Sequence, residues 1–195
     1  MIGRAAIEQE FYLDVGYGGA GCVDDGSRDG CLLAQGEMRQ NEREDEPDCF
    51  GHTEYVTAHT ILTIATKGKG LYSFTQQVSD WLRKQTVRHG SLLLFAQHTS
   101  CSLVIQENAD PDVIRDINEF FKHLVKENAP FYRHQSEGPD DMPSHIRSVL
   151  TATSISIPVV DGRLVLGTWQ GIYVFEHRAH PHRRSVVLHL AGDAK

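Results

Sequence analysis

The chain has 195 residues, 40% of them hydrophobic and 23% charged, which is typical of a globular protein. This length allows one domain, or one domain with an appendage, and excludes two large domains. Residues 1–52 hold 12 acidic and 4 basic residues, whereas residues 53–195 hold 14 acidic and 15 basic. A near-neutral main domain lacks the basic field that nucleic acid or an anionic membrane attracts, which argues against both as partners.

The first 52 residues are rich in Gly, Asp, Glu, Gln and Arg and hold few large aliphatic side chains. Such a segment cannot bury enough apolar surface to offset the entropy of ordering, so we predict a mostly disordered extension at 1–52 and a folded domain at 53–195. The N-terminal residues carry charges where a signal peptide needs an apolar stretch, and no run approaches the length of a membrane span. We therefore expect a soluble, cytoplasmic protein with four free thiols, since the cysteine spacings match no zinc pattern.

The sequence of the first half of the domain predicts a strand, a helix and two further strands. Polar and apolar residues alternate over 55–66, which indicates a half-buried strand. Ser73 followed by Gln76 resembles a capping box, and Gly90 stands where the helix that follows Ser73 should stop. The apolar run 91–97 predicts a strand buried on both faces, and 102–107 predicts the next strand after a short link.

The second half predicts two further helices and a set of strands. Asp110 and Pro111 open a helix whose apolar stripe continues to Asn128 and is expected to face the core. Residues 129–142 form a long polar loop, which we interpret as a lid, and a short helix is expected from Pro143. An Asp-Gly pair between 154–160 and 163–168 predicts a hairpin, and strands follow at 171–176 and 185–190. The fold class is therefore α+β: one compact domain with a mixed, largely antiparallel sheet, two main helices and one short helix.

Three short segments carry the polar chemistry, and each contains a histidine. They are 97–100 with 106–108, then 140–145, then 167–171 leading to 176–178. Polar residues at strand ends can reach a shared cleft, and imidazoles from three elements could hold a metal while leaving a position open for water or substrate. The spacing alone also fits three unrelated surface histidines, because the chain contains 11 histidines.

Arginine and acidic residues in these segments suggest further roles. Arg178 is a candidate phosphate clamp because a guanidinium matches phosphate oxygens in bidentate fashion, and Arg147 could assist it. Glu107 and Asp141 are candidate proton carriers, although acidic residues at strand ends are commonly just solvated. Cys101 has no evident orienting partner, which argues against a nucleophile.

The stretches QHTSCSLVIQENADP (97–111), EGPDDMPSHIRS (137–148) and GTWQGIYVFEHR (167–178) resemble the signature segments of the YjbQ family, whose members are labelled secondary thiamine-phosphate synthase. The resemblance covers residues 54–192. It implies a small α+β domain assembled as a homotrimer, with a divalent metal ion, zinc or magnesium, or an anion held near His98, His145 and His177. It also implies an activity that joins a pyrimidine diphosphate to a thiazole phosphate and releases pyrophosphate.

The leading hypothesis is therefore a metal-dependent transferase acting on a phosphorylated small molecule. His98, His145 and His177 would hold the metal, and Glu107, Asp141 and His145 would serve catalysis. Substrate-binding roles fall on five polar residues of the motifs: Thr99, Asn108, Thr168, Gln170 and Arg178. Two alternatives remain open at this point, a metal-dependent hydrolase of another metabolite and a non-catalytic metabolite-binding protein.

Overall fold

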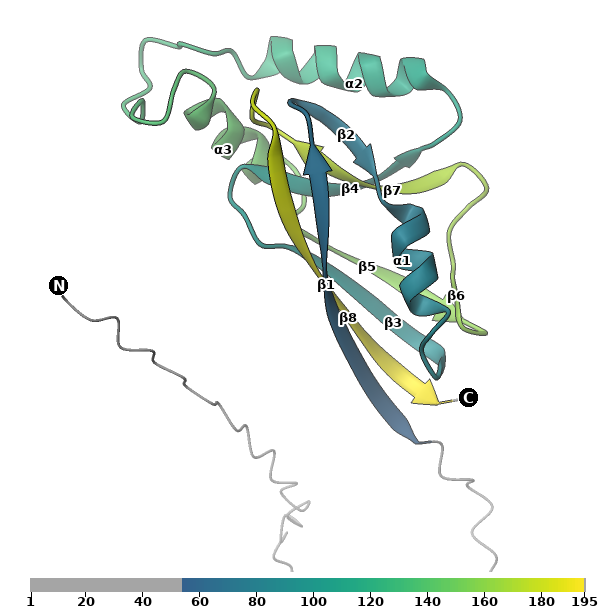
Figure 1. Ribbon diagram of the computed structural model, residues 1–195. Coiled ribbons are helices and arrows are strands. Elements are labelled where there is room, and N and C mark those ends of the chain that lie inside the picture. Colours follow the sequence, from purple (N-terminus) through teal and green to yellow (C-terminus); the bar gives the residue numbers. More distant parts are fainter. Residues whose placement is uncertain (1–53, 195) are drawn as a thin grey trace, which may run out of the picture. The chain divides into compact units, whose positions relative to one another are not determined.

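The computed structural model describes residues 54–194, which form two antiparallel sheets and three helices (Figure 1). The five-stranded sheet has the order β1-β8-β3-β5-β6, and the three-stranded sheet has the order β2-β7-β4. The strands are β1 (Tyr55–Thr66), β2 (Gly70–Ser73), β3 (Val87–Ala96), β4 (Cys101–Glu107), β5 (Ser154–Val160), β6 (Arg163–Leu164), β7 (Gln170–Glu176) and β8 (His182–Ala194). The helices are α1 (Thr75–Leu82), α2 (Pro111–Leu124) and α3 (Asp141–Leu150).

Both sheets contribute to one hydrophobic core. Leu92 and Leu94 of β3 and Leu188 of β8 are fully buried on the large sheet, and Ile172 and Val174 of β7 are fully buried on the small one. More buried residues alternate with more exposed ones along β1, β3, β5 and β8, as expected for a sheet with one face on the core. The α+β class is confirmed. Every strand pair among the described residues is antiparallel.

The Asp-Gly hairpin is confirmed in its turn and shortened in its second strand. Asp161 and Gly162 have φ values of 51° and 71°, the left-handed conformation that a two-residue hairpin loop requires. Val160 pairs with Arg163 and Val159 with Leu164, after which β6 ends. The predicted strand 163–168 is therefore only two residues long. Residues 165–169 form an irregular link to β7, and each of them is exposed or half-buried.

The predicted end of α1 at Gly90 is wrong, because Gly90 lies inside β3. The helix ends at Leu82, and Phe74 rather than Ser73 occupies its N-cap position, without a side-chain capping bond. Gly90 pairs with Gly192 of β8 beside a register shift. A Cβ atom at Gly90 would lie 2.2 Å from the carbonyl oxygen of Ala191, so this glycine is required by close strand approach rather than by a helix end.

Helices α2 and α3 differ from their predicted limits by a few residues. The Asp110 side chain accepts a hydrogen bond of 2.8 Å from the Asp112 N–H, which confirms the predicted cap, but α2 ends at Leu124 rather than near Asn128. Its apolar stripe is only half-buried, and α2 contains no fully buried residue. Phe121 packs edge-on against Phe175 of β7 with ring centroids 5.1 Å apart, so α2 lies over the three-stranded sheet (Figure 1). Helix α3 begins at Asp141, two residues before the predicted start.

None of the helices in the described part is long and apolar enough to cross a membrane. The predicted disordered extension at 1–52 lies outside the described residues, as do three of the four cysteines. The division of the chain at residue 52 therefore stays a prediction.

Candidate functional site

A cluster of two imidazoles and one carboxylate lies at the N-terminal half of α3. Among residues 54–194, the one group of three potential metal ligands whose ligand atoms all lie within 4.8 Å of one another consists of His134, Asp141 and His145. Asp141 and His145 stand one helical turn apart on the same face of α3. His134 comes from the loop that precedes this helix, and its ring centroid lies 5.5 Å from that of His145.

The carboxylate oxygen at the centre of this cluster has no hydrogen bond. The Oδ2 atom of Asp141 is buried, and it lies 2.7 Å from the Nε2 atom of His134 and 3.7 Å from the Nε2 atom of His145. The approach of His134 is close, yet its geometry does not meet that of a hydrogen bond. A buried carboxylate oxygen facing two imidazole nitrogens in this way fits a cation held between them.

His145 is oriented so that its Nε2 atom is free to act as a ligand. Its Nδ1 atom lies 3.1 Å from the carbonyl oxygen of Thr99, an acceptor that requires the proton to be on Nδ1. With the proton on Nδ1, the nitrogen that can bind a metal is Nε2, which faces Asp141. A second ring nitrogen bonded to a backbone carbonyl is the usual arrangement for a metal-binding histidine.

His98 has the opposite tautomer. Its Nδ1 atom accepts hydrogen bonds from the N–H of Ser100 at 3.1 Å and from the Ser100 hydroxyl at 3.0 Å, which leaves the proton on Nε2. Burial, followed by the charge of Arg184, lowers the pKa of His98, so the ring is neutral at pH 7. In this arrangement His98 presents an N–H donor rather than a ligand lone pair, and its place among the metal ligands stays a prediction.

His177 also does not join the cluster. It is completely buried, and its Nε2 atom lies 2.9 Å from the Ser102 hydroxyl. Burial, with a further contribution from the charge of Arg147, lowers the pKa of His177 to about 3. The predicted triad is therefore not assembled within one chain, because the ring of His177 lies inside the fold while His98 and His145 line the surface.

The residue before His177 anchors a buried ion pair beneath His98. The carboxylate of Glu176 on β7 accepts two hydrogen bonds from Arg184 on β8, of 2.6 and 2.5 Å, and one of 2.8 Å from Thr66 on β1. Burial raises the pKa of Glu176, but these bonds and the Arg178 N–H outweigh burial and hold it below its ordinary value. Arg184 also donates to Ser100 at 3.1 Å, so the pair joins both sheets and positions the serine that orients His98.

Arg178 anchors the start of α3 instead of offering a free guanidinium to phosphate. It forms ion pairs with Asp140, at 3.2 Å, and with Asp141, and it donates to the Glu137 carbonyl oxygen at 2.8 Å. Burial raises the pKa of Asp140, but the Ala179 N–H and the charge of Arg178 outweigh it and lower the pKa. Through these bonds from Nε, Nη1 and Nη2, Arg178 positions Asp141, and its predicted role as a phosphate clamp stays a prediction.

The remaining predicted residues lie at the other end of the β4–β7 strand pair. Cys101 pairs with Glu176 at one end, and Glu107 pairs with Gln170 at the opposite end. Asn108 and Thr168 flank that second end and are exposed. Because this ladder spans about 20 Å, these residues do not share a cleft with the histidines of the same chain.

A shallow pocket of about 450 Å³ lies beside the cluster and is lined by His98, Thr99 and His145 together with Ser148, Val149, Thr151 and Thr153. Of the predicted residues, the structure thus brings together His98, Thr99, Asp141 and His145.

Cys101 is fully buried behind these residues, and burial raises the pKa of its thiol to about 11. This pKa excludes Cys101 as a nucleophile at neutral pH.

Sequence reasoning missed His134. Its loop was predicted as a lid on the strength of length and polarity, but no spacing rule connects a loop histidine to a helix that starts seven residues later. The signal that could have identified it was its position in a long polar loop leading directly to Asp141.

Residues 60–193 match the family described as "UPF0047 protein YjbQ-like". The UPF0047 protein sll1880 of Synechocystis is 53% identical over 133 residues, covering 68% of this chain and 90% of that protein. The YjbQ protein of Escherichia coli is 43% identical over 133 residues, covering 68% of this chain and 96% of its own.

Solved structures of YjbQ-like proteins resemble this chain as well. An uncharacterized YjbQ/UPF0047 protein of Clostridium acetobutylicum is 33% identical with a TM-score of 0.61, covering 66% of this chain and 97% of that one. A YbjQ-like protein of unknown function from Sulfolobus solfataricus, 21% identical, shares the fold with a TM-score of 0.65, covering 71% of this chain and 99% of that one. The chain belongs to the YjbQ-like UPF0047 family.

Proposed function

We propose that the protein is a metal-dependent enzyme acting on phosphorylated small molecules, with thiamine-phosphate synthesis as its assignable reaction. The observation that carries the metal is the buried Asp141 Oδ2 atom, which has no hydrogen bond and faces the Nε2 atoms of His134 and His145. Two imidazoles and a carboxylate are a donor set that suits zinc better than magnesium, which prefers oxygen ligands.

The proposed reaction needs a leaving diphosphate to be stabilised. The bond between the pyrimidine methylene carbon and the diphosphate oxygen breaks with its electron pair on the diphosphate, and the thiazole nitrogen forms the new bond to that carbon. A divalent cation held by His134, Asp141 and His145 would supply positive charge for the departing oxygens. The neutral ring of His98 adds an Nε2–H donor next to His145 in the same pocket.

The other residues of this site act by positioning. Thr99 accepts from His145 through its carbonyl oxygen and fixes the ring. Arg178 holds the Asp141 carboxylate from the side opposite the imidazoles, because it binds Oδ1 while they face Oδ2. Ser100 fixes the tautomer of His98. The predicted roles of Glu107, Asn108, Thr168 and Gln170 would require these residues to come from another copy of the chain.

A homotrimer remains part of the proposal, and the open face of the five-stranded sheet supports self-association. Ile61 and Phe95 both pair with Val187 of β8, which places the three side chains in one row across β1, β8 and β3. Ile61 is 56% exposed and Phe95 45% exposed. An apolar row of this kind on a sheet is typical of an interface. Light scattering of the purified chain should show three copies, and Phe95→Glu should reduce this to one copy.

Metal analysis tests the ligand set. Purified protein should contain one zinc per chain, and His134→Ala, Asp141→Asn and His145→Ala should each lose it while the circular dichroism spectrum is retained. His98→Ala and His177→Gln separate this set from the triad expected from the sequence, because both should keep the metal. His123→Ala, an exposed histidine on α2, is the matched control. Metal lost from His98→Ala and retained in His134→Ala would overturn the proposed set.

The reaction is tested with the whole chain, the pyrimidine diphosphate and the thiazole phosphate. We expect pyrophosphate release that depends on both substrates, is abolished by His145→Ala and is reduced by His98→Ala with metal content unchanged. No release at any substrate concentration would reject the transferase.

A second candidate is a metal-dependent hydrolase, since two imidazoles with one carboxylate is also the ligand set of known zinc hydrolases. The same assay distinguishes the two. A hydrolase would release phosphate or pyrophosphate from one substrate alone, without the second substrate and without forming a carbon–nitrogen bond.

A further inference from the structure

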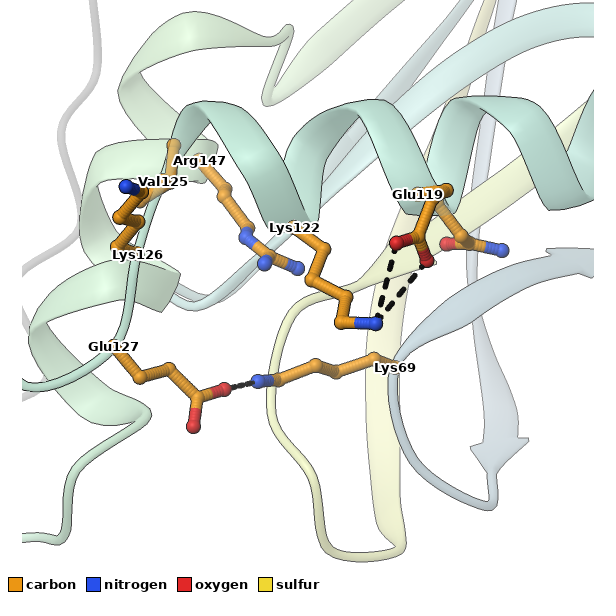
Figure 2. A pocket seen from close by; sticks show the side chains of 8 residues that line it. Lys69, Glu119, Lys122, Val125, Lys126, Glu127 and Arg147 are labelled. Atoms are coloured by element: carbon orange, nitrogen blue, oxygen red, sulfur yellow. Dashed lines mark hydrogen bonds and ion pairs between the residues drawn. The ribbon is translucent and has the colours of Figure 1, made fainter.

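A second polar pocket lies on the other side of α3, between this helix, the C-terminal end of α2 and the turn that joins β1 to β2 (Figure 2). Its volume is about 560 Å³, within the range of small-molecule sites. It shares no lining residue with the pocket beside His98 and His145. The charged side chains that line it are Lys69, Lys122, Lys126, Arg147, Glu119 and Glu127.

Helix α3 separates the two pockets. His145 and Arg147 are two residues apart, which places their side chains about 200° apart around the helix axis. His145 lines the pocket with His98, whereas Arg147 lines the basic pocket. Figure 2 shows the Arg147 guanidinium reaching toward Lys122 from behind the end of α2. Occupation of one pocket therefore does not require the other.

Arg147 is the feature that calls for a ligand. It is only 3% exposed, and its Nε atom is buried without a hydrogen-bond partner. No described residue forms an ion pair with its guanidinium, whereas Arg178 and Arg184 each bind carboxylates. Burial lowers the pKa of Arg147, an effect that the charge of Glu127 partly opposes. A buried guanidinium without a counter-ion destabilises the fold, and a bound anion would remove this destabilisation.

The rest of the lining has an excess of positive charge. Lys69 is paired with Glu127, and Lys122 contacts Glu119 at 3.2 Å (Figure 2). These pairs use both carboxylates of the pocket. Lys126 has no ion pair within the described part of the chain, so Lys126 and Arg147 leave two positive charges uncompensated. Two charges match the dianion of a phosphate group, and the guanidinium provides the bidentate donors that phosphate oxygens accept.

We propose that this pocket is an anion site for a phosphate or diphosphate group of a small molecule, with Arg147 as its principal donor and Lys126 as its second charge. The site is independent of the proposed metal cluster and does not rest on the proposed reaction. Its arginine forms no ion pair with a described carboxylate, whereas Arg178 is held by Glu137, Asp140 and Asp141.

The test is calorimetric titration of the whole chain with inorganic diphosphate and inorganic phosphate in metal-free buffer, combined with thermal unfolding. Wild-type protein should bind diphosphate and gain thermal stability from it. Arg147→Met should weaken binding by at least about tenfold, as expected for loss of a charged hydrogen-bond donor. Lys126→Gln should weaken it by a smaller factor, and Arg133→Met, an exposed arginine of the loop before α3, should leave binding unchanged.

The ligand-free stability of Arg147→Met distinguishes binding from structure. Removal of an uncompensated buried charge in favour of an apolar side chain of similar length should raise the melting temperature of the free protein or leave it unchanged. A purely structural arginine would instead lower it. His145→Ala should bind diphosphate as tightly as wild type does, because His145 lies on the opposite side of α3 from the basic pocket. The proposal is overturned if wild-type protein fails to bind diphosphate, or if Arg147→Met binds it with wild-type affinity.

Discussion

The two ends of the β4–β7 strand pair carry the same kinds of residue but in opposite environments. At one end Cys101 pairs with Glu176, and Glu176 and His177 are completely buried with Arg184. At the other end Glu107 pairs with Gln170, and Trp169 is 63% exposed. The residue types of the polar motifs therefore do not show whether the motifs form one site. The antiparallel pairing of β4 and β7 determines which motif residues lie close together.

The largest effect is expected from the buried end. Glu176→Gln leaves the Arg184 guanidinium, which is 2% exposed, without its carboxylate. Breaking a buried ion pair from one side typically costs about 3–5 kcal/mol, so the free energy of unfolding in urea should fall by that amount. Glu107→Gln makes the same chemical change at the exposed end and should alter the free energy of unfolding by less than about 0.5 kcal/mol. Equal losses would mean that the two ends do not differ in energy.

A smaller effect is expected where the buried end meets α3. Arg178→Ala removes the partner of Asp140 and Asp141, and charged hydrogen bonds of this kind contribute about 2 kcal/mol to stability. Because Asp141 then loses the anchor on its Oδ1 atom, zinc affinity should also fall by about 10- to 100-fold. Titration with a zinc indicator measures this. If stability falls while zinc affinity is unchanged, Arg178 has a structural role and does not position the ligand.

The fold was more predictable than the site. Alternation in 55–66 and the Asp161-Gly162 pair are local signals, and they predicted the first strand and the hairpin turn correctly. Gly90 was misinterpreted because its reason is the approach of Gly192, a residue far away in sequence. His145 and Asp141 were found because they lie in one short polar segment, whereas His134 and the burial of His177 depend on how separate elements pack.

His177 offers a way to measure the burial of this end through pH. Burial lowers its pKa to about 3, whereas an unfolded histidine has a pKa of about 6.5. The folded state therefore binds fewer protons between these values. The contribution of His177 to stability is complete above about pH 6.5 and is lost at about 1.4 kcal/mol per pH unit as the pH decreases toward 3.

Urea unfolding between pH 4.5 and 6.5 tests this before the lowered pKa of Glu176 adds its own loss in stronger acid. His177→Gln should flatten the dependence of stability on pH in that window, and His123→Gln, on the exposed face of α2, should leave it as in wild type. An unchanged slope in His177→Gln would show that other groups cause the acid sensitivity.

The smallest effect is expected at the exposed end, from Trp169→Ala. Its side chain is mostly in solvent, so the free energy of unfolding should change by less than about 0.5 kcal/mol, and zinc affinity should be that of wild type. Within one chain this end lies about 20 Å along the ladder from His177, so the KM of the monomeric Phe95→Glu variant should not respond to the loss of Trp169. A rise in KM that occurs only in the associated protein would place Trp169 of one copy at the histidines of another, because within a single chain the two ends are too far apart for contact.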